Sequence, residues 1–130
     1  MYNVPVDLQE EFRVRTKPFV VCVCGGRDFL DTKLLSRILG SLKRPTLLVH
    51  GGARGADALA DAWARKHDIP VIVFAADWRK HKKAAGPIRN GRMLAEANPR
   101  LVIAFPGGSG TADCAGQARA RDILVMYVGG

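Results

Sequence analysis

The sequence predicts an α/β fold: a Rossmann-like, doubly wound parallel sheet of about five strands in a single three-layer αβα domain. Five short apolar runs alternate with segments of helical periodicity, as expected for strands that are joined by crossover helices. The runs are apolar throughout, which indicates strands covered on both faces. Right-handed crossovers then favour the strand order 3-2-1-4-5, with a ligand crevice between strands 1 and 4.

The first strand is expected at about 19–24. Pro18 precedes it, where a missing N–H is tolerated because the first position of a strand need not donate to the ladder. A helix is expected at about 31–42, with Asp31 or Thr32 as its N-cap. Its apolar stripe consists of Leu34, Leu35, Ile38, Leu39 and Leu42.

The second strand is expected at about 46–50 and its helix at about 54–67. The apolar face of that helix is assigned to Ala58, Leu59, Ala62 and Trp63. The third strand, at 71–74, is followed by a longer loop at 75–86 and a helix near 87–97. Pro87 suits the first turn of that helix.

The fourth strand is expected at about 101–105, the last helix at about 110–120 and the fifth strand at 123–128. No linker or repeat divides the chain, so we expect one domain over 18–130 after an N-terminal arm of low order over 1–17. No apolar run approaches the ~18–20 residues of a membrane span. The three cysteines are an odd number, and two of them lie in an expected buried strand. A reduced, cytoplasmic setting without membrane contact is therefore expected.

Four strand ends are followed by loops that suit phosphate or sugar. Glycine permits close approach of a ligand to the backbone, and helix starts offer unpaired N–H groups to an anion. A nucleotide-like ligand is therefore the first hypothesis. The candidate ligand-binding residues are Gly25, Gly26, Arg27, Asp28, Gly51, Gly52, Arg54, Asp57, Asp77, Trp78, Arg89, Asn90, Gly107, Gly108, Ser109, Gly110 and Thr111.

The segment Pro106–Thr111 is the most specific of these loops. Its glycines make a tight turn into a helix, and Ser109 and Thr111 add hydroxyls beside free N–H groups. A phosphate fits this set, although no lysine follows as in a Walker motif. A tight strand-to-helix turn is the alternative interpretation.

Other residues keep two interpretations. Asp57 is either a ribose acceptor or a helix N-terminal carboxylate, and His50 is either an acid–base group or a structural histidine. Trp78 either stacks on a base or anchors a loop. The basic run Arg79–Lys83 is either solvated surface or a nucleic-acid contact, given the net charge of +8. Cys22 and Cys24 are assigned to packing, and no metal site or cofactor is expected.

These motifs together resemble the SLOG superfamily, most closely its YspA/YpsA-related branch of small bacterial and phage proteins. The matching segments are CGGRDF (24–29), HGGARGADALADAWA (50–64), ADWRKHKKAAGPIRNGRML (76–94) and AFPGGSGTAD (104–113). The resemblance implies a Rossmann-like fold, a nucleotide-derived ligand and, from relatives that dimerise through flanking helices, a homodimer.

The chain is also similar to the Lonely-guy phosphoribohydrolases, which cleave the N-glycosidic bond of nucleoside monophosphates. Arg89 and Met93 match their R-x-x-x-M segment, and Pro106–Thr111 match their glycine loop. Cys114 stands at the position of their essential glutamate, and a thiol cannot replace that carboxylate.

Two alternative functions follow from these relatives. If this chain is a nucleotide N-glycosidase, the candidate catalytic residues are Arg89, which holds the phosphate, and Asp113 or Asp77, which polarises water. The related DprA proteins bind single-stranded DNA, so single-stranded nucleic acid is the other alternative ligand, through Arg79–Lys83.

Overall fold

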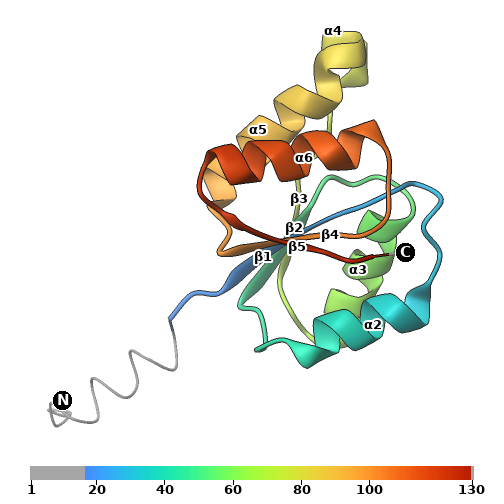
Figure 1. The fold of residues 1–130 in the computed structure, drawn as a ribbon, viewed down its shortest axis with the longest axis vertical. Helices are drawn as coiled ribbons and strands as arrows, with labels where there is room; N and C mark the ends of the chain where they lie inside the picture. Colours follow the sequence, from blue (N-terminus) through green and yellow to red (C-terminus); the bar gives the residue numbers. More distant parts are fainter. Residues whose placement is uncertain (1–16, 130) are drawn as a thin grey trace, which may run out of the picture.

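The computed structural model describes residues 17–129 and shows a sheet between two layers of helices (Figure 1). All but the last residue of the expected N-terminal arm, 1–17, lies outside the described residues. The elements are β1 (Val20–Cys24), α2 (Thr32–Ser41), β2 (Leu47–His50), α3 (Ala56–Lys66), β3 (Val71–Val73), α4 (Trp78–His81), the 3-10 helix η1 (Lys82–Ala84), α5 (Ala85–Ala97), β4 (Leu101–Ala104), α6 (Ser109–Ala120) and β5 (Leu124–Tyr127).

The five strands form one sheet of order β3-β2-β1-β4-β5, and every neighbouring pair is parallel. The predicted fold class and strand order are confirmed. Because β1 and β4 are neighbours while their helices lie on opposite faces, the loops after these two strands flank the topological switch point.

Each face of the sheet has its own core. Val21 and Val23 point toward α2 and α3, whereas Cys22 and Cys24 point toward α5 and α6. The alternation follows from the period of two in a strand. Cys22 and Cys24 are buried in the second core, together with Met93 and Leu94 of α5.

The stripe predicted for α2 is confirmed, and Asp31 is its N-cap, accepting from the Leu34 N–H at 3.0 Å. The face assigned to α3 was wrong in part, because Ala58 and Ala62 are exposed. The buried face instead joins Ala56, Ala60 and Ala64 to the partly buried Leu59 and Trp63.

The expected loop 75–86 also needs correction, since it contains α4, η1 and the first two residues of α5. The α4–η1 segment projects from the body of the molecule beyond the start of α5 (Figure 1). Asp77 is the N-cap of α4 and accepts from the Lys80 N–H at 3.1 Å, which stabilises a turn that apolar periodicity does not reveal.

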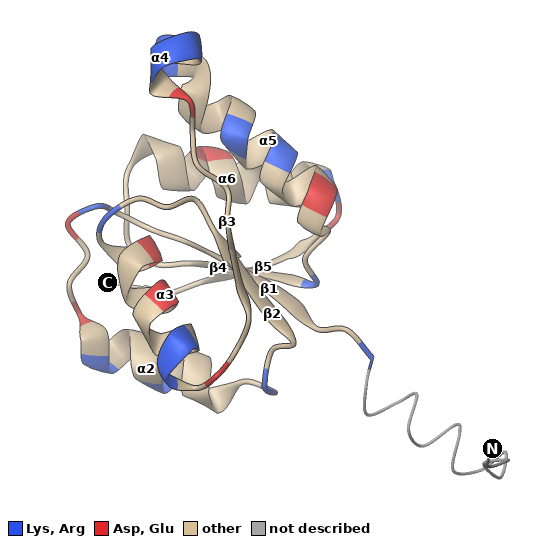
Figure 2. Cartoon of the chain, turned by 180° about the vertical axis from the view of Figure 1, so that it is seen from behind, with Lys and Arg blue, Asp and Glu red and all other residues tan. Residues whose placement is uncertain are grey.

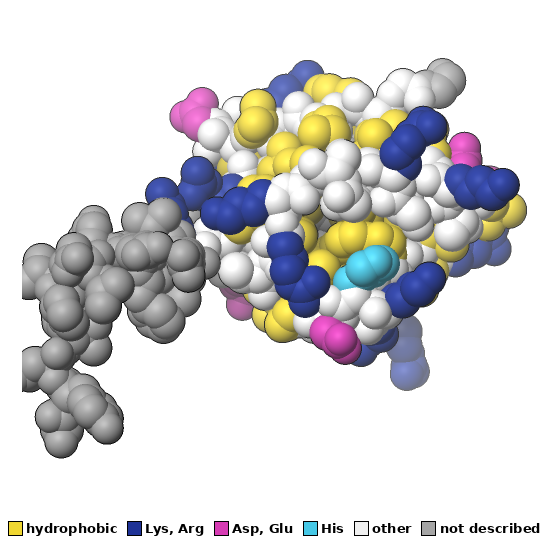
Figure 3. Space-filling model, turned by 90° about the horizontal axis from the view of Figure 1, so that it is seen from below, with side chains coloured by type: hydrophobic (Ala, Val, Ile, Leu, Met, Phe, Trp, Pro, Cys, Tyr) yellow, Lys and Arg dark blue, Asp and Glu magenta, His cyan; other side chains and the backbone are white. Residues whose placement is uncertain are grey.

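Basic residues gather on α4 and continue along α5 (Figure 2). On the face seen from below, Lys and Arg side chains are scattered among apolar ones instead (Figure 3). Among residues 17–129, no helix is both long enough and apolar enough to span a bilayer.

Candidate functional site

The loops after β1 and β4 touch at the switch point. The Gly26 N–H donates to the Pro106 carbonyl at 2.9 Å. A Cβ at Gly26 would lie 2.9 Å from that same oxygen, and one at Gly107 would lie 2.6 Å from the Gly26 nitrogen. Glycine at these two positions is therefore required for the loops to meet, independently of any ligand.

A cavity of about 530 Å³ opens beside these loops, within the range of about 300–1,000 Å³ that is usual for small-molecule sites. It is bounded by the carboxyl ends of β1 and β2 and by the first turns of α3, α5 and α6. Its lining residues are Val23, Cys24, Gly25, Gly26, Arg27, Gly51, Ala53, Asp57, Trp78, Lys83, Gly86, Pro87, Arg89, Asn90, Met93, Gly108, Ser109, Gly110, Thr111, Asp113 and Cys114.

Most of the residues nominated from sequence line this cavity, and five do not. Asp28 and Arg54 are exposed and face each other at 3.5 Å. Gly52 and Gly107 shape their loops, and Asp77 caps α4. Several lining residues are not among the candidates indicated by the sequence: Val23, Cys24, Ala53, Gly86, Pro87 and Met93. Lys83 and Cys114 also line the cavity, although the sequence indicates other roles for them.

Arg89 ties the inner end of the cavity to the sheet. Its Nη1 donates to the carbonyls of Gly51 and Phe74, the latter at 3.3 Å, and its Nε donates to Asn90 Oδ1 at 2.8 Å. A Cβ at Gly51 would overlap the guanidinium. The Arg89 guanidinium, a candidate phosphate ligand, thus also fixes the ends of β2 and β3 relative to α5.

Asn90 extends this hydrogen-bond network to α6. Its Nδ2 donates to Asp113 Oδ2 at 3.0 Å, and that oxygen also accepts from Gln117 Nε2 at 2.8 Å. Asn90 is only 4% exposed. The Asp113 carboxylate, nominated for catalysis, is therefore held by two amide groups at the edge of the cavity.

Asp57 closes the β2–α3 loop. Its Oδ2 accepts from the backbone N–H groups of Gly51, at 3.1 Å, and Ala53, at 3.2 Å. Burial raises the pKa of the Asp57 carboxyl above its ordinary value, and these N–H donors and the nearby Arg89 charge oppose that rise. The geometry supports the interpretation of Asp57 as a loop-closing carboxylate.

His50 is buried beneath the same loop and does not line the cavity. Its Nδ1 accepts from the Gly52 N–H at 2.9 Å, so Nε2 carries the proton and donates to Asp61 Oδ2 at 2.7 Å. Both ring nitrogens are thus used to hold the loop, as in the structural interpretation of this histidine.

Three thiols lie beneath the cavity. Hydrogen bonds from Cys22 and Cys24 lower the pKa of the Cys114 thiol to about 4, and the nearby Arg89 charge acts in the same direction. The same hydrogen bonds, with burial, raise the pKa values of Cys22 and Cys24. Cys114 and Cys24 line the cavity, although Cys114 is only 1% exposed.

Three long helices begin at the cavity. Ser109, Gly110 and Thr111 of α6, Gly86 and Pro87 of α5, and Asp57 of α3 all line it. The first N–H groups of a helix lack intrahelical partners and carry its positive dipole end. The first N–H of α3, on Ala56, donates to the Gly26 carbonyl at 3.2 Å, whereas α6 has Gly108 at its N-cap and no side-chain capping bond.

The outer end of the cavity is aromatic and basic. Trp78, which is 48% exposed, lines it together with Arg27 and Lys83. Within residues 17–129, no group of three His, Cys, Asp or Glu residues is arranged to hold a metal ion.

Fold and site together define a Rossmann-like domain with a crevice at the carboxyl ends of its strands. Residues 19–81 match the family described as YAcAr, the YspA, cpYpsA-related SLOG family. The Gene 61 protein of Mycobacterium phage D29 is 41% identical over 120 residues, which cover 84% of this chain and 95% of that protein. The chain belongs to the YspA, cpYpsA-related SLOG family.

Among solved structures, the DNA processing protein A (DprA) of Streptococcus pneumoniae has a similar fold. The TM-score is 0.72 at 20% sequence identity, and the match covers 88% of this chain and 51% of that one. The chain thus spans about half of the DprA chain. At this identity the likeness concerns the fold, and it agrees with the superfamily that the sequence motifs indicate.

Proposed function

We propose that this protein binds a nucleotide or nucleotide derivative in the cavity, with a phosphate group against the first turn of α6. The convergence of three helix starts on one cavity of about 530 Å³ carries the proposal. The converging helix dipoles and the uncapped first turn of α6 favour an anion, and the cavity has room for more than an inorganic ion. Membership of a SLOG family supports a nucleotide-derived ligand.

The rest of the cavity is consistent with an anionic ligand. Its two carboxylates, Asp57 and Asp113, each accept from two N–H donors, so their charges are offset within the protein. Arg89 offsets the charge of Cys114, whose pKa is lowered to about 4. Arg89 adds positive charge at the inner end of the cavity, and Arg27 and Lys83 add it at the outer end.

Calorimetry of the full chain tests the proposal, with nucleoside monophosphates, diphosphates, cyclic nucleotides and ADP-ribose as ligands. We expect saturable binding of at least one of them below millimolar concentration. Absence of binding by every compound at millimolar concentration, with the protein folded by circular dichroism, would contradict it. Mass spectrometry of small molecules released from the denatured protein would identify a ligand that is retained through purification.

Single-stranded nucleic acid is a second candidate ligand, because the projecting α4–η1 segment presents Arg79, Lys80, Lys82 and Lys83 beside the exposed Trp78. The similar structure is that of a DNA processing protein. Phosphate contacts of this kind weaken steeply as salt is raised. A mobility shift with single-stranded DNA that is absent even at low salt would remove this candidate.

The N-glycosidase alternative receives no separate support from the geometry. Asp113 is engaged by two amides, Asp77 caps α4, and Cys114 is buried. Release of free base from a nucleoside monophosphate, measured by chromatography, would nevertheless establish it. The homodimer that the resemblance implies remains a proposal, which a monomer mass in analytical ultracentrifugation would contradict.

A further inference from the structure

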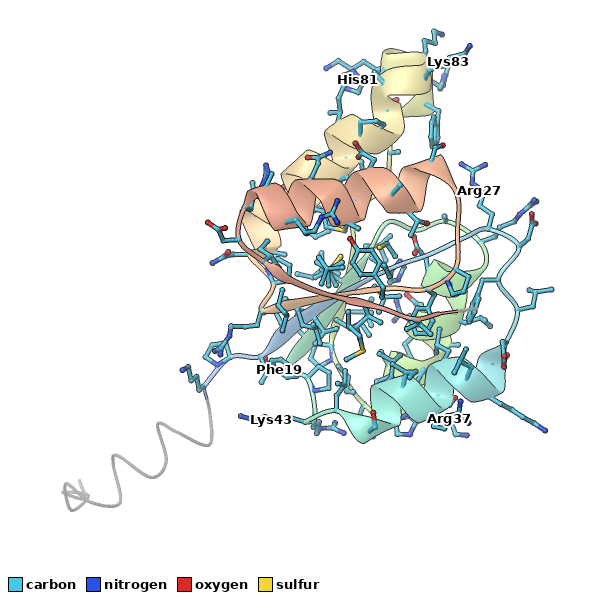
Figure 4. The ribbon with its side chains drawn as sticks, viewed as in Figure 1. Phe19, Arg27, Arg37, Lys43, His81 and Lys83 are labelled. Carbon is cyan, nitrogen blue, oxygen red and sulfur yellow. The ribbon has the colours of Figure 1, made fainter. Side chains whose placement is uncertain are left out.

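Two basic side chains face the outer end of the cavity from different elements. Arg27 follows β1 and Lys83 belongs to η1, and both line the cavity. Figure 4 shows them on the side of the molecule where α6 begins, with Lys83 on the projecting segment. Neither forms an ion pair with any residue of the described part of the chain.

The acidic residues closest to them in sequence are engaged elsewhere. Asp28 faces Arg54 at 3.5 Å, and Asp77 accepts from the Lys80 N–H at 3.1 Å. No Asp or Glu lines the cavity except Asp57 and Asp113, which accept from N–H donors. The outer end therefore has positive charge that no acidic group of the described residues offsets.

Trp78 holds one of these cations in place. The Arg27 guanidinium carbon lies 5.6 Å from the centre of the Trp78 ring, and the tip of that ring packs beside Gly86, where a Cβ would lie 3.5 Å from Trp78 Cη2. Stacking uses the flat face of a guanidinium and leaves its N–H edges free to donate. Arg27 is thus positioned with its hydrogen-bonding capacity still available.

A single phosphate at the α6 start would leave this second group of donors without an anion. We propose that the ligand carries two linked phosphoryl groups, as in a nucleoside diphosphate or a derivative of one. The α6 start binds one phosphoryl group, and Arg27 and Lys83 bind the other. This inference rests on the proposed function and specifies the ligand class of the same cavity.

The test compares AMP with ADP, and inorganic phosphate with pyrophosphate, by calorimetry on the full chain at fixed ionic strength. The inorganic pair removes any dependence on the choice of base. We expect the diphosphate member of at least one pair to bind at least tenfold more tightly. The double variant Arg27→Ala/Lys83→Ala should remove that advantage, so that ADP binds no more than threefold more tightly than AMP, and pyrophosphate no more than threefold more tightly than phosphate.

Arg37→Ala/Lys43→Ala is the matched control, because it removes the same charge from exposed residues near α2, away from the cavity (Figure 4). It should keep the diphosphate preference. The inference is overturned if the unaltered protein binds both members of each pair equally, or if both double variants weaken diphosphate binding alike. It is also overturned if a 5′-phosphorylated oligonucleotide binds more tightly than ADP. If no nucleotide binds at all, the proposed function fails as well.

Discussion

The amide of Asn90, in α5, donates to the carboxylate of Asp113, in α6, at 3.0 Å. Asn90 also accepts from Arg89 Nε at 2.8 Å. This one buried side chain therefore joins α5 to α6, two of the three helices whose first turns line the cavity. It also joins them to the Arg89 guanidinium, which holds the ends of β2 and β3. The geometry of the cavity depends on it.

Replacing Asn90 with Ala should destabilise the fold by about 1–3 kcal/mol, because partners of a buried polar group lose their hydrogen bonds. Urea unfolding followed by circular dichroism measures this. Exposed Asn98 ends α5 at φ 44° and makes no bond to α6, so Asn98→Gly is a surface control and should not lose stability. Unaltered stability of Asn90→Ala would contradict the role given to this network.

Asp57 and Asp61 should give stability profiles of opposite sign. Burial raises the pKa of Asp57 above 3.8, whereas hydrogen bonds from Arg65 and His50 lower the pKa of Asp61 below 3.8. A carboxyl whose pKa is raised by folding stabilises the folded state below the pKa of the unfolded chain, and this stability is lost as pH rises through the folded-state pKa. A carboxyl whose pKa is lowered by folding stabilises the folded state above the pKa of the unfolded chain, and this stability is lost as pH falls through the folded-state pKa.

Asp57→Asn retains an acceptor for the loop N–H groups but does not titrate. Relative to the unaltered protein, it should therefore gain stability as pH rises from about 3.8 through the raised pKa. Asp61→Asn should instead lose relative stability as pH rises from below 3.8 to that value. Urea unfolding of the unaltered protein and both variants between pH 3 and 7 measures the free energy of unfolding at each pH. If this free energy varies with pH in the same way in the two variants, the pKa directions assigned to Asp57 and Asp61 are wrong.

Cys114 should be a thiolate at neutral pH. Hydrogen bonds from Cys22 and Cys24 lower the pKa of Cys114 to about 4, so ultraviolet thiolate absorbance should persist well below pH 8. Cys114→Ser should abolish that absorbance, whereas Cys22→Ala should shift its titration to higher pH. Absence of any thiolate signal below pH 8 in the unaltered protein would refute the assignment.

The architecture could be predicted because it depends on local pattern. Apolar runs, helix caps and glycine loops lie within short windows of sequence, and right-handed crossovers restrict the strand order. The same pattern predicts a crevice between strands 1 and 4, where the glycine loops that begin at Gly25 and Pro106 meet. The turn of α4 follows from its Asp77 cap instead, and Ala85 and Gly86, the two residues that extend α5 ahead of Pro87, are buried.

The engagement of individual side chains could not be predicted in this way. Asp113 and Asn90 are far apart in sequence, and only the packing of α5 on α6 brings them together. Arg89 was nominated as a phosphate ligand, yet its donors to Gly51 and Phe74 depend on where β2 and β3 end. Asp77 offered a local signal, because an aspartate followed by Trp-Arg-Lys is a possible N-cap.

Arg89 and Thr111 should contribute unequally to ligand affinity. Thr111→Ala removes one hydroxyl at the α6 start and should cost about 1 kcal/mol of binding free energy. Arg89→Ala removes a charged donor and should cost about 2 kcal/mol or more, together with stability, since its backbone acceptors lose their partner. Calorimetry and thermal melts separate the two effects. Full affinity in Arg89→Ala would show that the ligand lies elsewhere.

The central claim is that the first turn of α6 binds the phosphate of a nucleotide. A Cβ at Gly108 meets no protein atom within 4 Å, and its φ of −103° is negative, as L side chains require. Gly108→Val should therefore fold normally while its side chain occupies the approach to the N–H groups. Gly116→Ala, also free of contacts within 4 Å but away from the cavity lining, is the matched control.

The decisive measurement is calorimetry of the best-binding nucleotide against the unaltered protein, Gly108→Val and Gly116→Ala, each shown to be folded by thermal melting. We predict that Gly108→Val abolishes binding and that Gly116→Ala binds as the unaltered protein does. Binding of the nucleotide to folded Gly108→Val with undiminished affinity would contradict the account.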